Sequence, residues 1–168
     1  MACQNMTLRR RLISAFVGFA VSLIFLADLR AQEDPQPLPD LGPSLEVLTP
    51  DQQVLAKRFL SFIAQMEEKK FARIATLNGG SQYEDRQEET PYAIWQLRVT
   101  RGSVVEKAGR MLTYVTKTGP NPPRPGEVIW GRAYFLDIHP KTPLVGMLHA
   151  VILLQFYKDG SSTAGGWL

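Results

Sequence analysis

One long helical pattern, followed only by strand patterns, constrains the fold of this chain more than any other feature. Thr49-Pro50-Asp51-Gln52 offers a helix N-cap, a proline at the first helical position and a capping-box glutamine. The pattern stops at Asn78-Gly79-Gly80, a sequence typical of a helix end. Between these signals, apolar side chains recur at helical spacing and form one stripe: Leu55, Phe59, Phe62, Ile63, Met66, Phe71 and Ile74. Charged residues lie mostly off the stripe and predict a solvated face: Lys57, Glu67, Glu68, Lys69 and Lys70.

The rest of the chain alternates between apolar and polar residues with the period of a β-strand. The loop at residues 119–126 holds four prolines and must lie outside any sheet interior. One helix followed by about five strands at hairpin spacing predicts an α+β domain, with a mainly antiparallel β-sheet packed against the helix. The strands are expected at residues 92–99, 111–117, 128–138 and 147–157, with a last short strand after the turn at Asp159-Gly160.

Residues 147–157 carry the most detailed strand pattern. Every even-numbered residue from 148 to 156 is apolar, so this face is expected to meet the helix. The other face holds His149 together with Gln155 and Tyr157. A histidine in this position either is satisfied by a neighbour or lines a pocket, and the strand pattern leaves both interpretations open.

The N-terminal residues 1–31 are typical of a signal peptide. Three arginines at 9–11 precede sixteen uncharged, mainly apolar residues, and Ala31 offers a cleavage site. The apolar run is shorter than the roughly 20 residues that a membrane span needs, although an uncleaved anchor is the alternative. Residues 32–48 contain four prolines and predict an extended Pro-rich linker, with the folded domain at 49–168. We therefore expect an exported protein, periplasmic or extracellular, that meets the membrane only through its leader.

The basic character of the chain belongs to this leader. The chain has 19 Lys+Arg and 16 Asp+Glu, and the leader holds four of the basic residues and one of the acids. The remainder therefore carries 15 of each and no net charge, so we expect no nucleic-acid partner. Cys3 is the only cysteine and lies in the leader, which excludes disulfides and thiol chemistry from the remainder.

Two stretches of the chain carry a recognisable motif. The first, Val104-Val105-Glu106-Lys107-Ala108-Gly109, is similar to a phenylalanine-Glu-Lys-Ala-Gly strand of the oxygen-dependent coproporphyrinogen oxidase family. Ile138-His139-Pro140-Lys141-Thr142-Pro143 resembles its histidine-proline motif, and His149 follows His139 by ten residues, as the second histidine does in the family. Between His149 and Gly165-Gly166-Trp167, the strand and hairpin resemble the family's approach to its glycine-rich segment. The resemblance covers about residues 84 to 168.

This resemblance implies a large antiparallel sheet in a homodimer and the oxidative decarboxylation of two porphyrinogen propionates. Molecular oxygen would be the co-substrate, and no organic cofactor is needed. Proton transfer would fall on His149 as the catalytic residue. His139, Lys141 and Arg132 would supply the polar groups that bind the porphyrinogen or another small molecule.

We expect no metal site, because two histidines without a cysteine make half a site. In the oxidase family both histidines have been considered as divalent-metal ligands, roles that would fall on His139 and His149. Asp137 shares a strand face with His139 by two-residue spacing and is a candidate third ligand.

The chain also departs from the family pattern. Phe135 stands where the family has a serine, and Val151 and Leu153 stand where it has asparagine and arginine on the face of the second histidine. An arginine can hold a propionate through a bidentate ion pair, and a leucine cannot. The resemblance nevertheless predicts a coproporphyrinogen oxidase-like protein. The alternatives are an exported, non-catalytic binding module for a tetrapyrrole and an incomplete copy whose core does not close. The departures favour the binding module.

Overall fold

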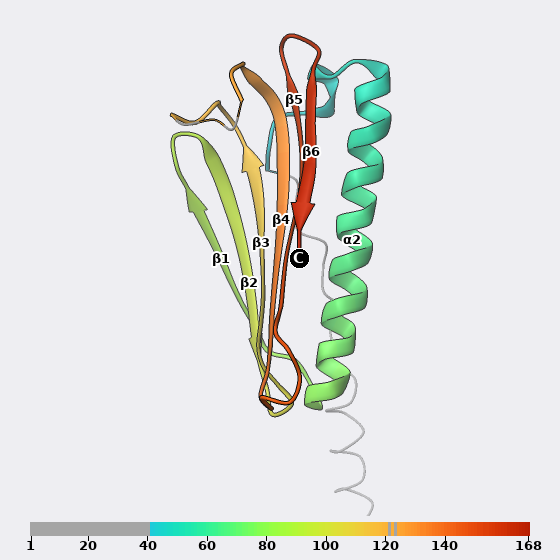
Figure 1. Cartoon of the computed structure of the whole chain (residues 1–168), viewed down its shortest axis with the longest axis vertical. Coiled ribbons are helices and arrows are strands. Elements are labelled where there is room, and N and C mark those ends of the chain that lie inside the picture. Colours follow the sequence, from blue (N-terminus) through green and yellow to red (C-terminus); the bar gives the residue numbers. More distant parts are fainter. Residues whose placement is uncertain (1–40, 121, 123) are drawn as a thin grey trace, which may run out of the picture. The chain divides into compact units, whose positions relative to one another are not determined.

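The computed structural model describes residues 41–120, 122 and 124–168 of the chain. The predicted signal peptide and the first part of the Pro-rich linker lie outside the described residues. Among the described residues, none of the helices has the length and apolar composition that a membrane crossing requires. The elements of Figure 1 are η1 (Leu45–Val47), α2 (Pro50–Asn78), β1 (Tyr83–Glu89), β2 (Ala93–Arg101), β3 (Val105–Val115), β4 (Val128–Pro140), β5 (Leu148–Tyr157) and β6 (Ser162–Trp167).

Helix α2 begins and ends at the residues that the sequence predicts. The Thr49 hydroxyl accepts a hydrogen bond from the Gln52 backbone N–H at 3.4 Å, and the Gln52 side chain accepts one from the Thr49 N–H at 3.1 Å. This reciprocal pair is the predicted capping box. At the other end Gly79 has a φ of 75°, a left-handed conformation that glycine adopts without steric cost. Both ends of the helix are therefore set by local chemistry.

The last residues of the predicted linker pack onto the folded unit. Leu48 is buried in a cluster with Ala56 of α2 and Trp130 of β4, and Leu41 packs against a neighbouring core cluster. The short helix η1 lies between them, with the Ser44 hydroxyl accepting from the Glu46 N–H at its start. The packed structure therefore begins before Thr49, because these leucines cover apolar surface beside α2.

The six strands pair in chain order as one antiparallel sheet, so the predicted α+β class with an antiparallel sheet is confirmed. The strand that the sequence analysis missed is β1, whose residues 83–89 read Tyr-Glu-Asp-Arg-Gln-Glu-Glu and lack apolar alternation. An edge strand needs only backbone pairing with one neighbour, so its side chains can all be polar. Strand β3 is also longer than predicted, because residues 105–110 continue directly into the segment expected at 111–117.

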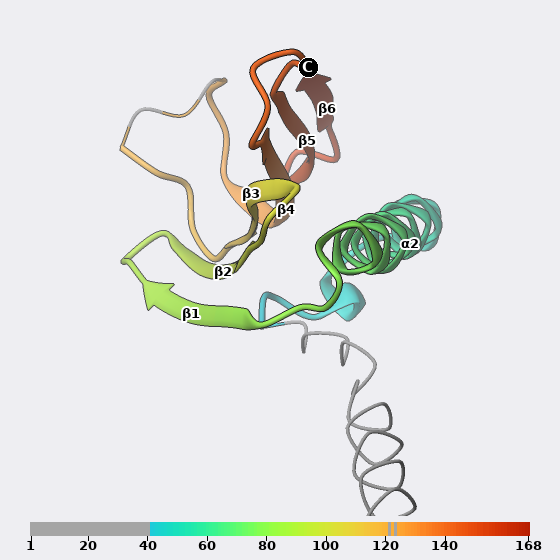
Figure 2. The same ribbon diagram turned by 90° about the horizontal axis from the view of Figure 1, so that it is seen from below.

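Helix α2 covers one face of the sheet, which we call the helix face (Figure 2). The opposite face, which we call the outer face, has no helix over it among the described residues. The side chains predicted to meet the helix from β5 do so: Leu148, Ala150 and Ile152 pack in one core cluster, and Leu154 and Phe156 in the next. The largest side chains of the helix-face core are Phe71, Tyr114, Tyr134, Trp130 and Phe156.

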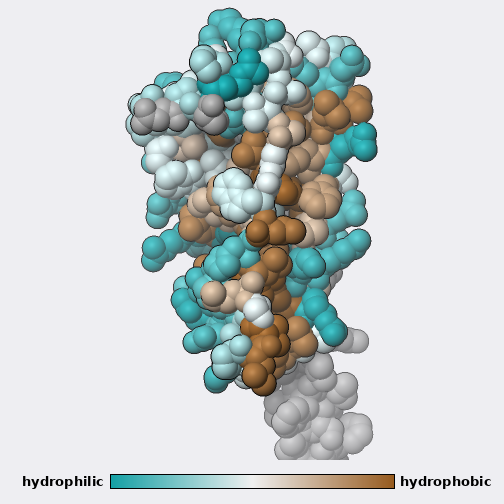
Figure 3. All heavy atoms as spheres, viewed as in Figure 1, coloured by the Kyte–Doolittle hydropathy of each residue, from teal (hydrophilic) through white to brown (hydrophobic). Residues whose placement is uncertain are grey.

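Only part of the predicted apolar stripe of α2 is covered by the sheet. Ile63, Phe71 and Ile74 are buried, whereas Leu55 and Phe62 are about half exposed. Figure 3 shows hydrophobic side chains gathered in a band along α2 and the β5–β6 hairpin, with hydrophilic ones on either side. A straight helix touches a sheet along one narrow line, so the margins of a wide stripe stay open to solvent.

Candidate functional site

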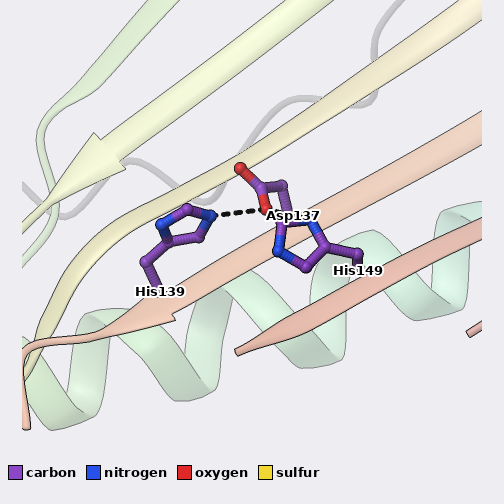
Figure 4. Close-up of side chains that lie close together, drawn as sticks. All are labelled: Asp137, His139 and His149. Atoms are coloured by element: carbon purple, nitrogen blue, oxygen red, sulfur yellow. Dashed lines mark hydrogen bonds and ion pairs between the residues drawn. The ribbon is translucent and has the colours of Figure 1, made fainter. Parts of the chain in front are cut away.

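Four polar side chains meet on the outer face, where β3, β4 and β5 lie side by side. Asp137 pairs with His149 across β4 and β5, and Lys107 of β3 pairs with His139 of β4. Asp137 and His139 point to the same side because alternate residues of a strand share a face. The two histidines, ten residues apart in the sequence, are thus brought together with Asp137 between them (Figure 4).

Asp137 is the centre of this cluster. Its Oδ1 lies 2.7 Å from His139 Nε2 and 2.8 Å from His149 Nδ1. Its Oδ2 lies 3.0 Å from Lys107 Nζ. The two imidazole rings meet edge to face, with their centroids 5.2 Å apart. Both carboxylate oxygens of Asp137 are therefore occupied by basic side chains.

The charges around Asp137 keep it ionised. Burial raises the pKa of its carboxyl group, but the hydrogen bonds and positive charges of Lys107 and His139 lower that pKa by more, so the net shift is downward. Two further basic residues lie at this end of the sheet: Arg101, the exposed register partner of Lys107, and Lys141, exposed directly after β4. Two exposed acids also lie at this end of the described sheet: Glu106, next to Lys107 in β3, and Glu84 of β1, the register partner of Val99. We call the group of Arg101, Lys107 and Lys141 the basic end.

An apolar row crosses the outer face beside the cluster, and we call it the apolar platform. Of its five residues, Val151 is buried, Trp167 is exposed, and Leu97, Met111 and Phe135 are half-buried. Asp137 belongs to the neighbouring row, in which Val99, Gly109 and Asp137 are successive register partners on β2, β3 and β4. Gly109 has no side chain, so nothing projects from the sheet between Val99 and Asp137 in this row. The register aligns the platform residues across five strands: Leu97, Met111, Phe135, Val151 and Trp167.

The platform contains positions at which the chain departs from the oxidase pattern. Phe135 and Val151 are register partners within the platform, and Leu153 lies one alternate position further along β5. All three share the outer face with His149, as the spacing predicts. Where the resemblance would place hydrogen-bonding side chains around the histidine, this protein presents an apolar surface.

The structure separates one predicted substrate-binding residue from the rest. His149 and His139 lie together and Lys141 lies at the basic end, but Arg132 is fully buried on the helix face. Its guanidinium lies 4.5 Å from the centroid of the Trp130 ring and donates to the Gly131 and Pro43 carbonyls. The parity of β4 reveals this placement, since residues 132 and 137 are an odd number apart and point to opposite faces.

A second charged cluster, on the helix face, was missed from the sequence. Glu67 Oε1 of α2 accepts from Arg110 Nε at 3.0 Å and from Arg98 Nη1 at 3.3 Å. Arg98 also donates to both carboxylate oxygens of Asp85, at 2.8 and 2.9 Å. The prediction of a solvated face was therefore wrong for Glu67, because α2 carries it over two buried guanidinium groups. Lys57, Glu68 and Lys69 are exposed as expected.

Asp137, His139 and His149 offer ligand atoms that all lie within 4.8 Å of one another, the composition of a two-histidine, one-carboxylate metal site. Each histidine, however, turns one nitrogen towards Asp137 Oδ1, and Lys107 holds the other oxygen. Binding one ion with all three residues would displace these contacts. The geometry suits Asp137 better as the residue that orients the imidazoles, and the predicted absence of a divalent-metal site stays a prediction.

Comparison with known proteins adds no precedent for this site. No protein-family model, no curated protein and no solved structure matches the chain. Function is therefore inferred from the geometry of the site alone.

Proposed function

We propose that this protein is a non-catalytic binding module whose outer face holds a planar, apolar ligand with acidic substituents, of the tetrapyrrole class. One observation carries the proposal: the apolar platform lies directly beside a cluster rich in basic side chains. A tetrapyrrole combines the same two properties, because its flat ring is apolar and its carboxylate side chains are anionic.

The platform has the width that such a ring needs. Neighbouring strands lie about 4.8 Å apart, so β3, β4 and β5 together present a surface about 10 Å wide, close to the width of a porphyrin ring. Met111 and Phe135 are half-buried and supply apolar contacts, and the buried Val151 fills the position between Phe135 and the exposed Trp167. Removing that surface from water is favourable by about 25 cal/mol for each Å² buried.

The basic end provides the matching charge. Arg101 and Lys107 are register partners on the outer face, and Lys141 is exposed beside them. Ammonium and guanidinium groups bind carboxylates through charge-assisted hydrogen bonds, which are about twice as strong as neutral ones. Two contacts of this kind orient the ring with its carboxylates towards the basic end and its apolar body over the platform.

Several features favour binding over catalysis. Stabilisation of a transition state needs fixed polar groups in a site from which water is excluded. Here the His149 side chain is 57% exposed, and Phe135, Val151 and Leu153 offer no hydrogen bonds. Arg132, the arginine that the sequence analysis assigned to the substrate, lies on the other face. Export, predicted from residues 1–31, is part of the proposal, with capture of the ligand outside the cytoplasm.

A titration tests the proposal. The full chain is mixed with metal-free protoporphyrin, and Soret absorbance and tryptophan quenching are followed, since Trp95 and Trp167 lie on the outer face. We expect saturable binding that Phe135→Ser weakens about tenfold, equivalent to about 1.4 kcal/mol. Phe62→Ser, which removes a half-exposed phenylalanine from α2, is the matched control and is expected to bind normally. Absence of binding, or an equal loss in both variants, would contradict the proposal.

Oxidase activity is the second candidate function, and the contact of both histidines with Asp137 favours it, because an oriented imidazole is suited to proton transfer. Incubation of the chain with coproporphyrinogen under air distinguishes the two functions. Vinyl-bearing product that His149→Ala abolishes would replace the binding proposal by catalysis. Binding without turnover would remove the oxidase.

A further inference from the structure

We infer that the ligand of the proposed tetrapyrrole site is a metalloporphyrin, which rests on the proposed function. His149 Nε2 is the axial ligand to the metal, and Asp137 is a positioning residue that holds the His149 ring. The inference starts from the two ring nitrogens of His149. Nδ1 lies 2.8 Å from Asp137 Oδ1, and no hydrogen bond or ion pair from the described residues reaches Nε2.

The contact with Asp137 favours one nitrogen of His149 for binding a metal. Nδ1 lies 2.8 Å from Asp137 Oδ1, within ion-pair distance, so this nitrogen faces the carboxylate as a protonated nitrogen would. In a neutral imidazole the other nitrogen then keeps its lone pair. Nε2 of His149 is consequently the metal-binding atom, and it points away from the carboxylate that holds the ring.

Asp137 and its partners form the support that an axial histidine requires. A histidine that binds a metal usually donates its second ring N–H to a carboxylate, which fixes the ring and raises its basicity. Asp137 is itself held by Lys107 at Oδ2 and by His139 at Oδ1. His139 also packs edge to face against the His149 ring, with centroids 5.2 Å apart. The imidazole of His149 is thus positioned before any ligand arrives.

The two histidines are not equivalent. The His139 side chain is 30% exposed and turns Nε2 towards Asp137, whereas the His149 side chain is 57% exposed. His149 is also next to the platform, since Val151 is two residues further along β5 and on the same face. Only His149 therefore combines an open position with a place at the edge of the apolar surface.

A single outward nitrogen suits a metal that brings its other ligands with it. A free divalent ion needs several protein ligands, and here those would have to be taken from the contacts around Asp137. A porphyrin supplies four equatorial nitrogens and leaves axial positions for the protein, as a proximal histidine does in haem proteins. Phe135 and Val151 lie beside His149 on the outer face, so the apolar body of a porphyrin held at Nε2 would meet the platform.

The experiment compares two ligands that differ only in the metal, ferric protoporphyrin and metal-free protoporphyrin, each titrated into the full chain. We expect the ferric form to bind about tenfold more tightly and to show the shifted Soret band of an imidazole-bound iron, with an iron–imidazole stretching band in the resonance Raman spectrum after reduction. His149→Ala should lower ferric affinity to the metal-free level and remove both signals. Added imidazole should restore the signals in this variant.

Two further variants test the separate roles. His139→Ala should keep the axial signals, and their loss in this variant alone would assign the ligand to His139 and overturn the inference. Asp137→Asn should keep coordination but raise the reduction potential of the bound iron, because the imidazole loses the electron-donating effect of a carboxylate partner. An unchanged potential would remove the positioning role.

The results also separate this inference from the function on which it rests. If both porphyrins bind equally and His149→Ala changes neither, the axial role is wrong and the tetrapyrrole site stands. If neither porphyrin binds, the proposed function itself fails.

Discussion

The two faces of this sheet each carry a cluster built on one carboxylate, and the surroundings of that carboxylate differ completely. On the helix face, Glu67 joins Arg98 and Arg110 beneath α2, and both guanidinium groups are buried. On the outer face, Asp137 joins two histidines and Lys107, all partly open to solvent.

The comparison shows how position and side-chain type separate a structural cluster from a functional one. Arginine stays charged at any ordinary pH, so a buried arginine needs its acid for the fold to be stable. Histidine changes protonation near neutrality and can offer a lone pair to a ligand. The helix-face cluster is therefore expected to act in stability, and the outer-face cluster in binding.

The largest expected effect is on the helix face. Glu67→Gln removes the charge that Arg98 and Arg110 share, and we expect a loss of about 3 kcal/mol in the free energy of unfolding. Urea denaturation measures it. Glu68→Gln, one residue further along α2 and exposed, is the control and should change stability by less than about 0.5 kcal/mol. Equal values for the two variants would mean that the buried cluster contributes nothing to folding.

A smaller effect is expected at the start of the helix that makes the two faces different. Thr49→Ala removes the hydroxyl that accepts from the Gln52 N–H, and we expect a loss of about 1 kcal/mol. Thermal unfolding followed by circular dichroism measures the change. Thr49→Ser keeps the acceptor and should stay close to the original stability. If alanine and serine behave alike, the capping box does not hold α2 in place.

The stability of the protein at acid pH tests the ion pair between Arg98 and Asp85, which adjoins the contacts of Glu67 with Arg98 and Arg110. The hydrogen bond from Arg98 lowers the pKa of Asp85 below its usual 3.8, although burial opposes this shift. The stabilisation is therefore complete above about pH 4 and is lost as pH falls through the lowered pKa. We expect Asp85→Asn to cost less than about 1 kcal/mol at pH 7, because the carboxylate is partly exposed.

Urea unfolding of Asp85→Asn and of the unmodified protein across the acid range measures this difference. The two stabilities should converge at the lowest pH, where Asp85 is protonated in both the folded and the unfolded protein. A constant difference across the range would show that the ion pair is not responsible.

The smallest effect on stability is expected on the outer face. His149→Ala should change the free energy of unfolding by less than about 0.5 kcal/mol, because the side chain is exposed and belongs to none of the hydrophobic core clusters of the described residues. The same variant is expected to lose the axial signals of bound ferric porphyrin. A loss of stability comparable to that of Glu67→Gln would make the outer-face cluster structural as well.

Much of the fold could be predicted because its signals are local. The ends of α2 are set by Thr49-Pro50-Asp51-Gln52 and by Gly79, and the apolar side of β5 is visible in its alternation. Strand β1 was missed because a charged edge strand is held by backbone pairing with β2, which leaves no apolar pattern. The β strands with strong alternation were found, and the one without it was not.

The site was predicted only in part. The resemblance to a family with two histidines ten residues apart suggested His139 and His149 as a pair, and Asp137 follows from the two-residue spacing in β4. Lys107 joins them only through the register of β3 against β4. Glu67 meets arginines that lie 31 and 43 residues away, and no local pattern links them.

Local sequence patterns specify the helix, its ends, most of the strands and the two sets of side chains on each strand. Tertiary packing selects which of the two sets lies under α2. In β2 the more apolar set of Trp95, Leu97 and Val99 lies on the outer face, while Gln96, Arg98 and Thr100 are buried on the helix face. Alternation divides a strand into two faces but does not say which one α2 covers, because register with neighbouring strands fixes that choice for the whole sheet.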